Sequence, residues 1–219
     1  MDYFIIETAP SPSGEEVVCK MEAREGRSIR QIKGEIAADF FGELNIPIKL
    51  GCESRVTEEK FGRIEYAMKK TDAVKAGLKL LSFAPNTKRA LREKLVVRGV
   101  SRDVAADAVE FLADCGYINE YEMALSLVSD MAKRRQYGRI RIKNEMFAKG
   151  FERETASRAL DDSDIDYVGI CAERVRKMGG TSSFVERDAR MKNVSNLARC
   201  GFTTDEIKEA LALVKKEEQ

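Results

Sequence analysis

Three glycines set the register of an internal repeat in this chain. Gly99, Gly150 and Gly201 are separated by 51 residues each. Around each glycine the same residue types recur without a gap: an apolar residue before it, an apolar residue directly after it, an acidic residue and an alanine. These columns are Leu95, Met146 and Leu197; Val100, Phe151 and Phe202; Asp103, Glu154 and Asp205; and Ala108, Ala159 and Ala210. A repeat of about 50 residues has room for three helices, and repeats of this length stack into arrays.

The residues between these columns have a helical pattern. From about Glu58 onward, Ala, Leu, Glu, Lys and Arg dominate, and apolar residues recur every three or four positions, which predicts helices. The three glycines follow helical stretches, as a residue just beyond a helix end would. Four cap residues predict helix starts: Thr87, Asn119, Ser183 and Thr203. The last three are each followed three positions later by a Glu, the spacing of a capping box. Asp161–Asp164 is predicted to be a solvated junction that also caps the next helix.

The first 60 residues differ from the rest. Two β-prone runs, Tyr3–Ile6 and Val17–Met21, are separated by the turn sequence Pro10–Gly14, and a second turn is predicted at Glu25–Arg27. The run Ile29–Lys33 alternates poorly, which leaves a third strand open. We expect a small β-rich module with one short helix near residues 37–41.

The expected fold is therefore mainly all-α, with tandem three-helix repeats of 51 residues behind a small β-rich N-terminal module. Charged residues make up 34% of the chain, against a usual share of about 25%, which favours a large surface and so an elongated array. The predicted parts are residues 1–60 for the N-terminal module and 61–119, 120–170 and 171–219 for helical repeats 1, 2 and 3.

The composition argues against an enzyme or a metal protein. The chain has no His, and its cysteines, Cys19, Cys52, Cys115, Cys171 and Cys200, form no closely spaced pair, so we expect no triad, no metal and buried, reduced thiols in a cytoplasmic protein. No dinucleotide or phosphate-loop motif occurs, and Gly179–Ser183, which lacks the lysine, is expected to be an interhelical loop. We predict no catalytic residue, no cofactor and no enzymatic activity. No apolar run approaches the roughly 18 residues of a membrane span.

Local clusters of cations are the most distinctive charge feature, because the net charge is only +1. The candidate binding residues are Lys88, Arg89, Arg92, Lys94, Arg98, Lys133, Arg134, Arg135, Arg139, Arg141 and Lys143. In the 51-residue register Lys88, Arg139 and Arg190 share one column, and Arg92 and Lys143 share another. Cations at the same place on stacked units suit a polyanion or an acidic protein groove. The alternative is an ordinary solvated helix face, which we expect for the weaker cluster of Arg187, Arg190, Lys192 and Arg199.

Several strings of the chain resemble the RecX family. The strings are Leu80–Leu95 with Arg98–Val100, Leu112–Ala124, Tyr137–Ile142 and Lys149–Phe151. The N-terminal β-rich stretch, which ends at Lys49–Gly51 and Thr57–Glu59, looks like the extra module of longer members. The chain departs from the family pattern at Asn119-Glu120, which replaces paired aspartates, at Arg139, which replaces a proline, and at Pro85–Thr87, which lacks an arginine.

The resemblance implies a curved, all-helical array that lies in the groove of the filament formed by RecA recombinase on DNA. It also implies a regulator, most simply an inhibitor, of RecA in the SOS response, DNA repair and recombination, with RecA and single- or double-stranded DNA as partners. We expect a monomer, with Arg89, Arg92, Arg135, Arg139, Arg141 and Lys143 in contact with the filament. One alternative is a DNA-binding protein of stacked helix-turn-helix-like units that acts without RecA. Another is a helical adaptor for an unrelated protein.

Overall fold

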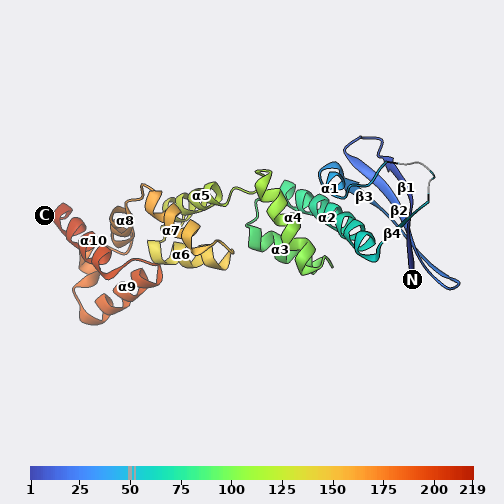
Figure 1. Ribbon diagram of the computed structural model, residues 1–219. Coiled ribbons are helices and arrows are strands. Elements are labelled where there is room, and N and C mark those ends of the chain that lie inside the picture. The colour runs from blue at the N-terminus through green and yellow to red at the C-terminus, as the bar shows by residue number, and fades with distance from the viewer. Residues whose placement is uncertain (49–50, 52) are drawn as a thin grey trace. The chain divides into compact units, whose positions relative to one another are not determined.

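The computed structural model describes residues 1–48, 51 and 53–219 (Figure 1). The chain forms two compact units, Met1–Ile118 and Asn119–Gln219, and each is described by itself. Three residues named in the sequence analysis lie outside the described residues: Lys49, Leu50 and Cys52. The fold is mainly helical with a small N-terminal sheet, which confirms the predicted class.

A four-stranded antiparallel sheet forms the N-terminal part of the first unit. Its strands are β1 (Asp2–Pro10), β2 (Glu16–Glu25), β3 (Ser28–Ala37) and β4 (Ser54–Val56), in the order β3-β2-β1-β4. The third strand, which the sequence left open, is therefore present as β3. Glu25 faces Ser28 across the β2–β3 turn, and Gly26 takes a φ of +59° there, as the second turn prediction required. A two-residue hairpin loop commonly needs this left-handed conformation.

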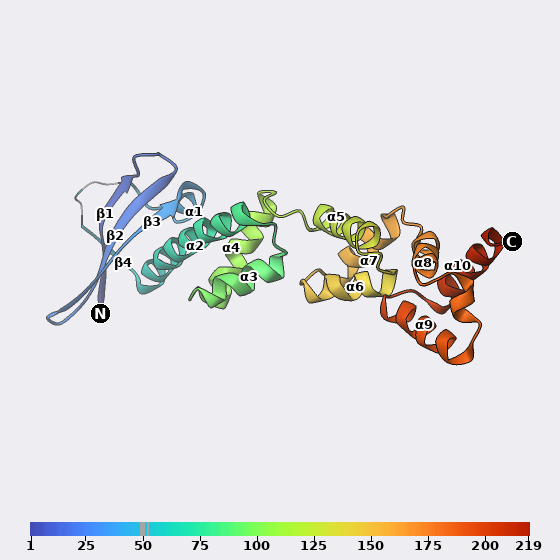
Figure 2. The ribbon, with the colours of Figure 1, turned by 180° about the vertical axis from the view of Figure 1, so that it is seen from behind.

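One long helix packs against the sheet (Figure 2). The short α1 (Ala38–Gly42) follows β3, near the predicted position, and α2 (Glu58–Phe83) begins at the predicted start of the helical pattern. Alternate residues of β2 are buried, from Val17 to Ala23, and they share one core with the buried face of α2. A Cβ on Gly34 of β3 would lie 2.9 Å from the Met68 sulfur, so the helix crosses close to the backbone of this strand.

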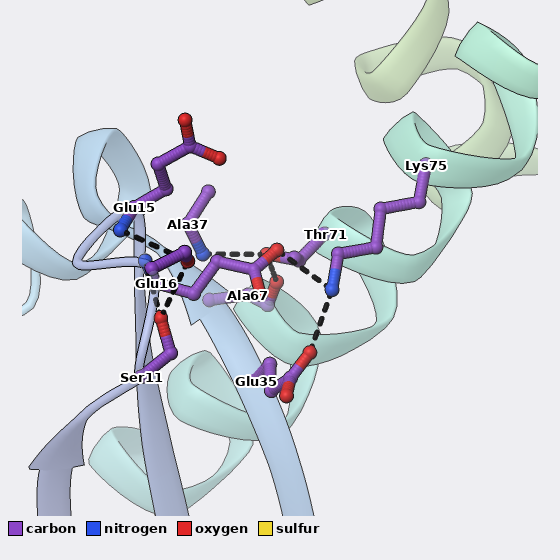
Figure 3. A network of polar contacts seen from close by, with 9 residues as sticks. Ser11, Glu15, Glu16, Glu35, Ala37, Ala67, Thr71 and Lys75 are labelled. Atoms are coloured by element: carbon purple, nitrogen blue, oxygen red, sulfur yellow. Dashed lines mark hydrogen bonds and ion pairs between the residues drawn. The ribbon is translucent and has the colours of Figure 1, made fainter.

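A polar network joins the C-terminal half of α2 to the sheet (Figure 3). The Lys75 ammonium lies 2.6 Å from both Glu16 and Glu35, and the Ala37 amide donates to the Thr71 hydroxyl at 3.0 Å. The hydrogen bonds that Lys75 donates to Glu16 and then to Glu35 raise the pKa of Lys75, and the bond from Lys75 lowers the pKa of Glu35. These side chains are partly exposed, so the network contributes orientation more than stability.

Helices complete both units. In the first unit α3 (Lys88–Val97) and α4 (Arg102–Asp114) pack on α2 around Leu91, Leu95 and Leu112. The second unit contains α5 (Glu120–Lys133), α6 (Arg139–Ala148), α7 (Arg153–Asp162), α8 (Tyr167–Lys177), the 3₁₀ helix η1 (Thr181–Phe184), α9 (Arg187–Arg199) and α10 (Thr204–Glu217). Two buried clusters lie in this unit, one formed mainly by α5–α7 and the other by α8–α10.

The three repeat glycines end α3, α6 and α9 in the same way. Their φ angles are +91°, +89° and +96°, a conformation that glycine adopts without a Cβ penalty. In each case the apolar residue after the glycine donates to the carbonyl of the apolar residue four positions before the glycine; the pairs are Val100 to Leu95, Phe151 to Met146 and Phe202 to Leu197. This is the Schellman motif, in which two carbonyls of the last helical turn are satisfied. The motif explains why these columns of the sequence repeat.

The predicted helix starts had mixed outcomes. Thr87 and Asn119 cap α3 and α5 with their side chains, and Thr203 forms a full capping box with Glu206. The prediction at Ser183 was wrong, because this residue lies in η1 and α9 begins after Glu186. The predicted cap within Asp161–Asp164 was also wrong, since Asp161 and Asp162 end α7 and the cap of α8 is Asp166.

The start of α6 and the end of α9 meet backbone to backbone in the second unit (Figures 1 and 2). The Gly138 amide donates to the Cys200 carbonyl at 2.8 Å, and the Ile140 amide donates to the Gly201 carbonyl at 3.1 Å. A Cβ on Gly138 would lie 2.3 Å from the Gly201 carbonyl group. Free amides at a helix start are thus satisfied by free carbonyls at a helix end, and both contact positions require glycine.

The described cysteines are not all alike. Cys19 and Cys171 are fully buried, and burial raises the pKa of each thiol to about 12. Cys200 is also buried, but Cys115 is exposed at the end of α4, so the expectation of burial was wrong for this residue. Its position just beyond the last turn of α4 explains the exposure.

Alkylation is expected to separate these thiols. At pH about 8 iodoacetamide should modify Cys115 within minutes, whereas Cys19 and Cys171 should react only in denaturant, because the thiolate is the nucleophile and buried thiols stay protonated. Peptide mass spectrometry of the labelled protein would show the order. Rapid native labelling of Cys171 would contradict the packing of α8.

Candidate partner-binding surface

The first candidate surface is built on α3. Leu91 and Leu95 fix the buried side of this helix, so the cations at the remaining positions face outward or lie along its flanks. Lys88 pairs with Glu110 of α4 at 2.8 Å, and Arg89 pairs with Glu93 at 3.0 Å. The remaining cations are Lys94, which donates to Asn86, and Arg92 and Arg98, both exposed.

The second candidate surface lies on α6 and the turn before it. Ile142 and Met146 are buried, and Arg139 and Lys143, one helical turn apart, share one flank. Arg139 forms an ion pair with Asp161 of α7. Lys133, Arg134 and Arg135 are exposed at the end of α5, with Arg134 paired to Asp130.

The first cation column joins helices within the first two repeats. Lys88 and Arg139 are 51 residues apart, and so are their partners Glu110 and Asp161. In each of these two repeats, the pair connects the second helix to the third. The sequence contains this signal, because each acid follows its cation by 22 residues in both repeats. Exposed pairs of this kind contribute about 0–1 kcal/mol each, so they orient the helices without removing the cations from solvent.

Arg141 does not lie with Arg139 and Lys143. Its guanidinium carbon stacks 4.1 Å from the centre of the Tyr137 ring, and it donates to the Arg199 carbonyl at 3.5 Å. Arg141 thus supports the contact between α6 and the end of α9. This cation cluster is therefore divided between two sides of the helix.

Six of the candidate cations have no carboxylate within ion-pair distance among the described residues. They are Arg92, Lys94 and Arg98 in the first unit and Lys133, Arg135 and Lys143 in the second. Such cations can bind phosphates or acidic side chains without first breaking an ion pair. We take these six as the core of the two candidate surfaces.

The described residues contain no candidate metal site. No three His, Cys, Asp or Glu side chains are grouped there so that they could hold a metal ion. Within the same residues, no helix is both long enough and apolar enough to cross a membrane. Binding of a charged partner is the chemistry that the arrangement supports directly.

Comparison with known proteins identifies the family. The profile of the RecX second three-helix domain matches residues 119–160. The regulatory protein RecX of Xanthomonas campestris pv. campestris is 30% identical over 140 residues, 64% of this chain and 86% of the relative. RecX of Halorhodospira halophila is 29% identical over 145 residues, 66% and 89% of the two chains.

Solved structures of RecX proteins share the fold. One crystal structure of regulatory protein RecX matches 94% of this chain and 99% of its own, with a TM-score of 0.70 and 16% identity. The RecX structure from Lactobacillus salivarius matches 68% of this chain and 97% of its own, with a TM-score of 0.62 and 23% identity. Together with the matched sequences, this coverage confirms the resemblance seen in the sequence. The chain belongs to the RecX family of regulatory proteins.

Proposed function

We propose that this protein regulates RecA recombinase by binding in the groove of the RecA–DNA filament and inhibiting its activity in recombination and repair. The observation that carries the proposal is membership of a family whose members are named regulatory proteins. The two cation surfaces support it, because a RecA–DNA filament offers both DNA phosphates and acidic side chains as partners. The proposed mode of action is binding alone, with no catalytic step.

We propose the same functional parts that the sequence suggested: residues 1–60, 61–119, 120–170 and 171–219. The three helical repeats would consist of α2–α4, α5–α7 and α8–α10. Because α2 starts at Glu58, the first boundary falls within its opening turn. Among the eleven candidate cations, we propose as contacts the six that no described carboxylate holds. Arg92, Arg135 and Lys143 stay from the contacts expected at first, whereas Arg89, Arg139 and Arg141 are held in ion pairs and give way to Lys94, Arg98 and Lys133. Arg92 and Lys143 occupy equivalent places in two repeats.

Co-sedimentation would separate this function from direct DNA binding. The protein should pellet with filaments of RecA on single-stranded DNA at both about 50 and about 200 mM salt, whereas binding that depends on phosphates alone falls steeply over that range. Equal binding to bare DNA and to filaments, with a steep loss in salt, would instead support the DNA-binding alternative. That alternative draws on the same cations, but a net charge of only +1 gives it no general attraction to DNA.

A further inference from the structure

An apolar groove runs between α9 and α10 in the second unit. It has a volume of about 460 Å³, within the range of about 300–1,000 Å³ typical of binding pockets. Its apolar lining consists of Met191, Val194, Ile207 and Leu211. Met191 keeps 63% of its surface exposed, and Leu197 is the buried residue of α9. The helix therefore presents the exposed Met191 and the half-buried Val194 at the groove.

The other two repeats place different residues at the same positions. In the 51-residue register, Val194 of α9 corresponds to Lys143 of α6 and Arg92 of α3. Ile207 of α10 corresponds to Ala156 and Ala105. At the half-buried position of Val194 the third repeat therefore lacks the cation that the first two repeats carry, whereas Ile207, Ala156 and Ala105 are all buried. This difference indicates a partner surface unlike the two cation surfaces.

The charges at the groove select the partner. Arg190 and Lys208 line it, and no carboxylate does. Lys208 contacts Asp205 at 3.2 Å, but both side chains are at least 72% exposed, so the pair can open at little cost. A ligand that combines apolar side chains with carboxylates would bury the apolar lining and place its charges against these two cations.

The polar groups of the lining favour a helical ligand. Beyond the two cations, the hydrogen-bonding side chains that line the groove are the hydroxyls of Ser195 and Thr204. An extended segment would bury backbone amides and carbonyls with few partners, whereas a helix satisfies its own backbone groups. We propose that the α9–α10 groove binds an acidic amphipathic helix of a partner protein, in the helix-in-groove mode.

A synthetic peptide tests this proposal on the full-length protein. The probe is a fluorescein-labelled amphipathic helix of roughly 18 residues, about five turns, with leucines along one face and glutamates on both flanks. Fluorescence anisotropy should show saturable binding. Met191→Asp, and separately Arg190→Glu with Lys208→Glu, should each weaken binding about tenfold or more, which is about 1.4 kcal/mol per factor of ten.

Matched controls keep the test specific. Ile140→Asp changes the residue of α6 that corresponds to Met191 and is 50% exposed, so it should leave peptide affinity unchanged. A peptide of the same composition with shuffled leucines, and one with lysines in place of glutamates, should not bind. Thermal melting would verify that the variants are folded. Absence of saturable binding, equal binding of the shuffled peptide, or unchanged affinity in folded groove variants would overturn the proposal. The assay contains no RecA, so its result is independent of the proposed regulation.

Discussion

Replacing Gly201 with alanine is expected to destabilise the second unit by about 3 kcal/mol. A φ of +96° costs a non-glycine residue about 1–2 kcal/mol. The new Cβ would also lie 2.4 Å from the Arg141 amide nitrogen, and such overpacking typically costs about 1–3 kcal/mol. Urea unfolding followed by circular dichroism would measure the loss, and hydrogen exchange would place it in α6, α9 and α10.

Gly99→Ala is the matched control for this experiment. Gly99 ends α3 in the same motif with a φ of +91°, but a Cβ there would have no atom within 4 Å. Only the conformational cost of about 1–2 kcal/mol should remain, and it should appear in the first unit. If the two variants lost equal stability, the close contact between α6 and the end of α9 would be wrong.

Charge reversal at Arg92 and Lys143 together should weaken binding to RecA–DNA filaments about tenfold or more. The two residues occupy one repeat column on α3 and α6, and neither is in an ion pair among the described residues. Their replacement with Glu removes no ion pair seen among the described residues, so the melting temperature should change little. Co-sedimentation with filaments, over a range of protein concentrations, would measure the affinity.

Lys215→Glu with Lys216→Glu provides the control for net charge. Both lysines are exposed in the last turn of α10, outside the candidate surfaces, and the double variant changes the net charge equally. It should bind filaments like the wild type. Equal weakening by both double variants would mean that overall charge, and not the α3 and α6 surfaces, determines binding.

The helical part of the fold could be predicted because local sequence marks where its helices end. A glycine at each Schellman motif, with apolar residues at fixed places around it, repeats visibly in one sequence. The strand β3 was harder to predict, because most of its residues are exposed or half-buried and it lies at the edge of the sheet. The helix start predicted at Ser183 was wrong because a capping-box spacing does not distinguish an α-helix start from a residue of a 3₁₀ turn.

The candidate surfaces were only partly predictable. Their cations could be found from charge and repeat register. Which of them are paired depends on where the third helix of each repeat, α4 or α7, places its acids. Helical spacing already places Arg141 and Lys143 on different sides. The hydrogen bond of Arg141 to the Arg199 carbonyl depends on the contact between α6 and the end of α9, which joins residues far apart in the chain. The α9–α10 groove likewise arises from packing between helices, and no local motif marks it.

The most direct test of the central claim is ATP hydrolysis by RecA on single-stranded DNA. The filament is formed first, and the folded protein is then added at much less than one molecule per RecA protomer. Regulation through the filament predicts that hydrolysis falls by more than the fraction of protomers that the added protein could occupy, because a bound molecule disturbs its neighbours. An unchanged rate would contradict the claim and leave DNA binding or an adaptor role to be tested.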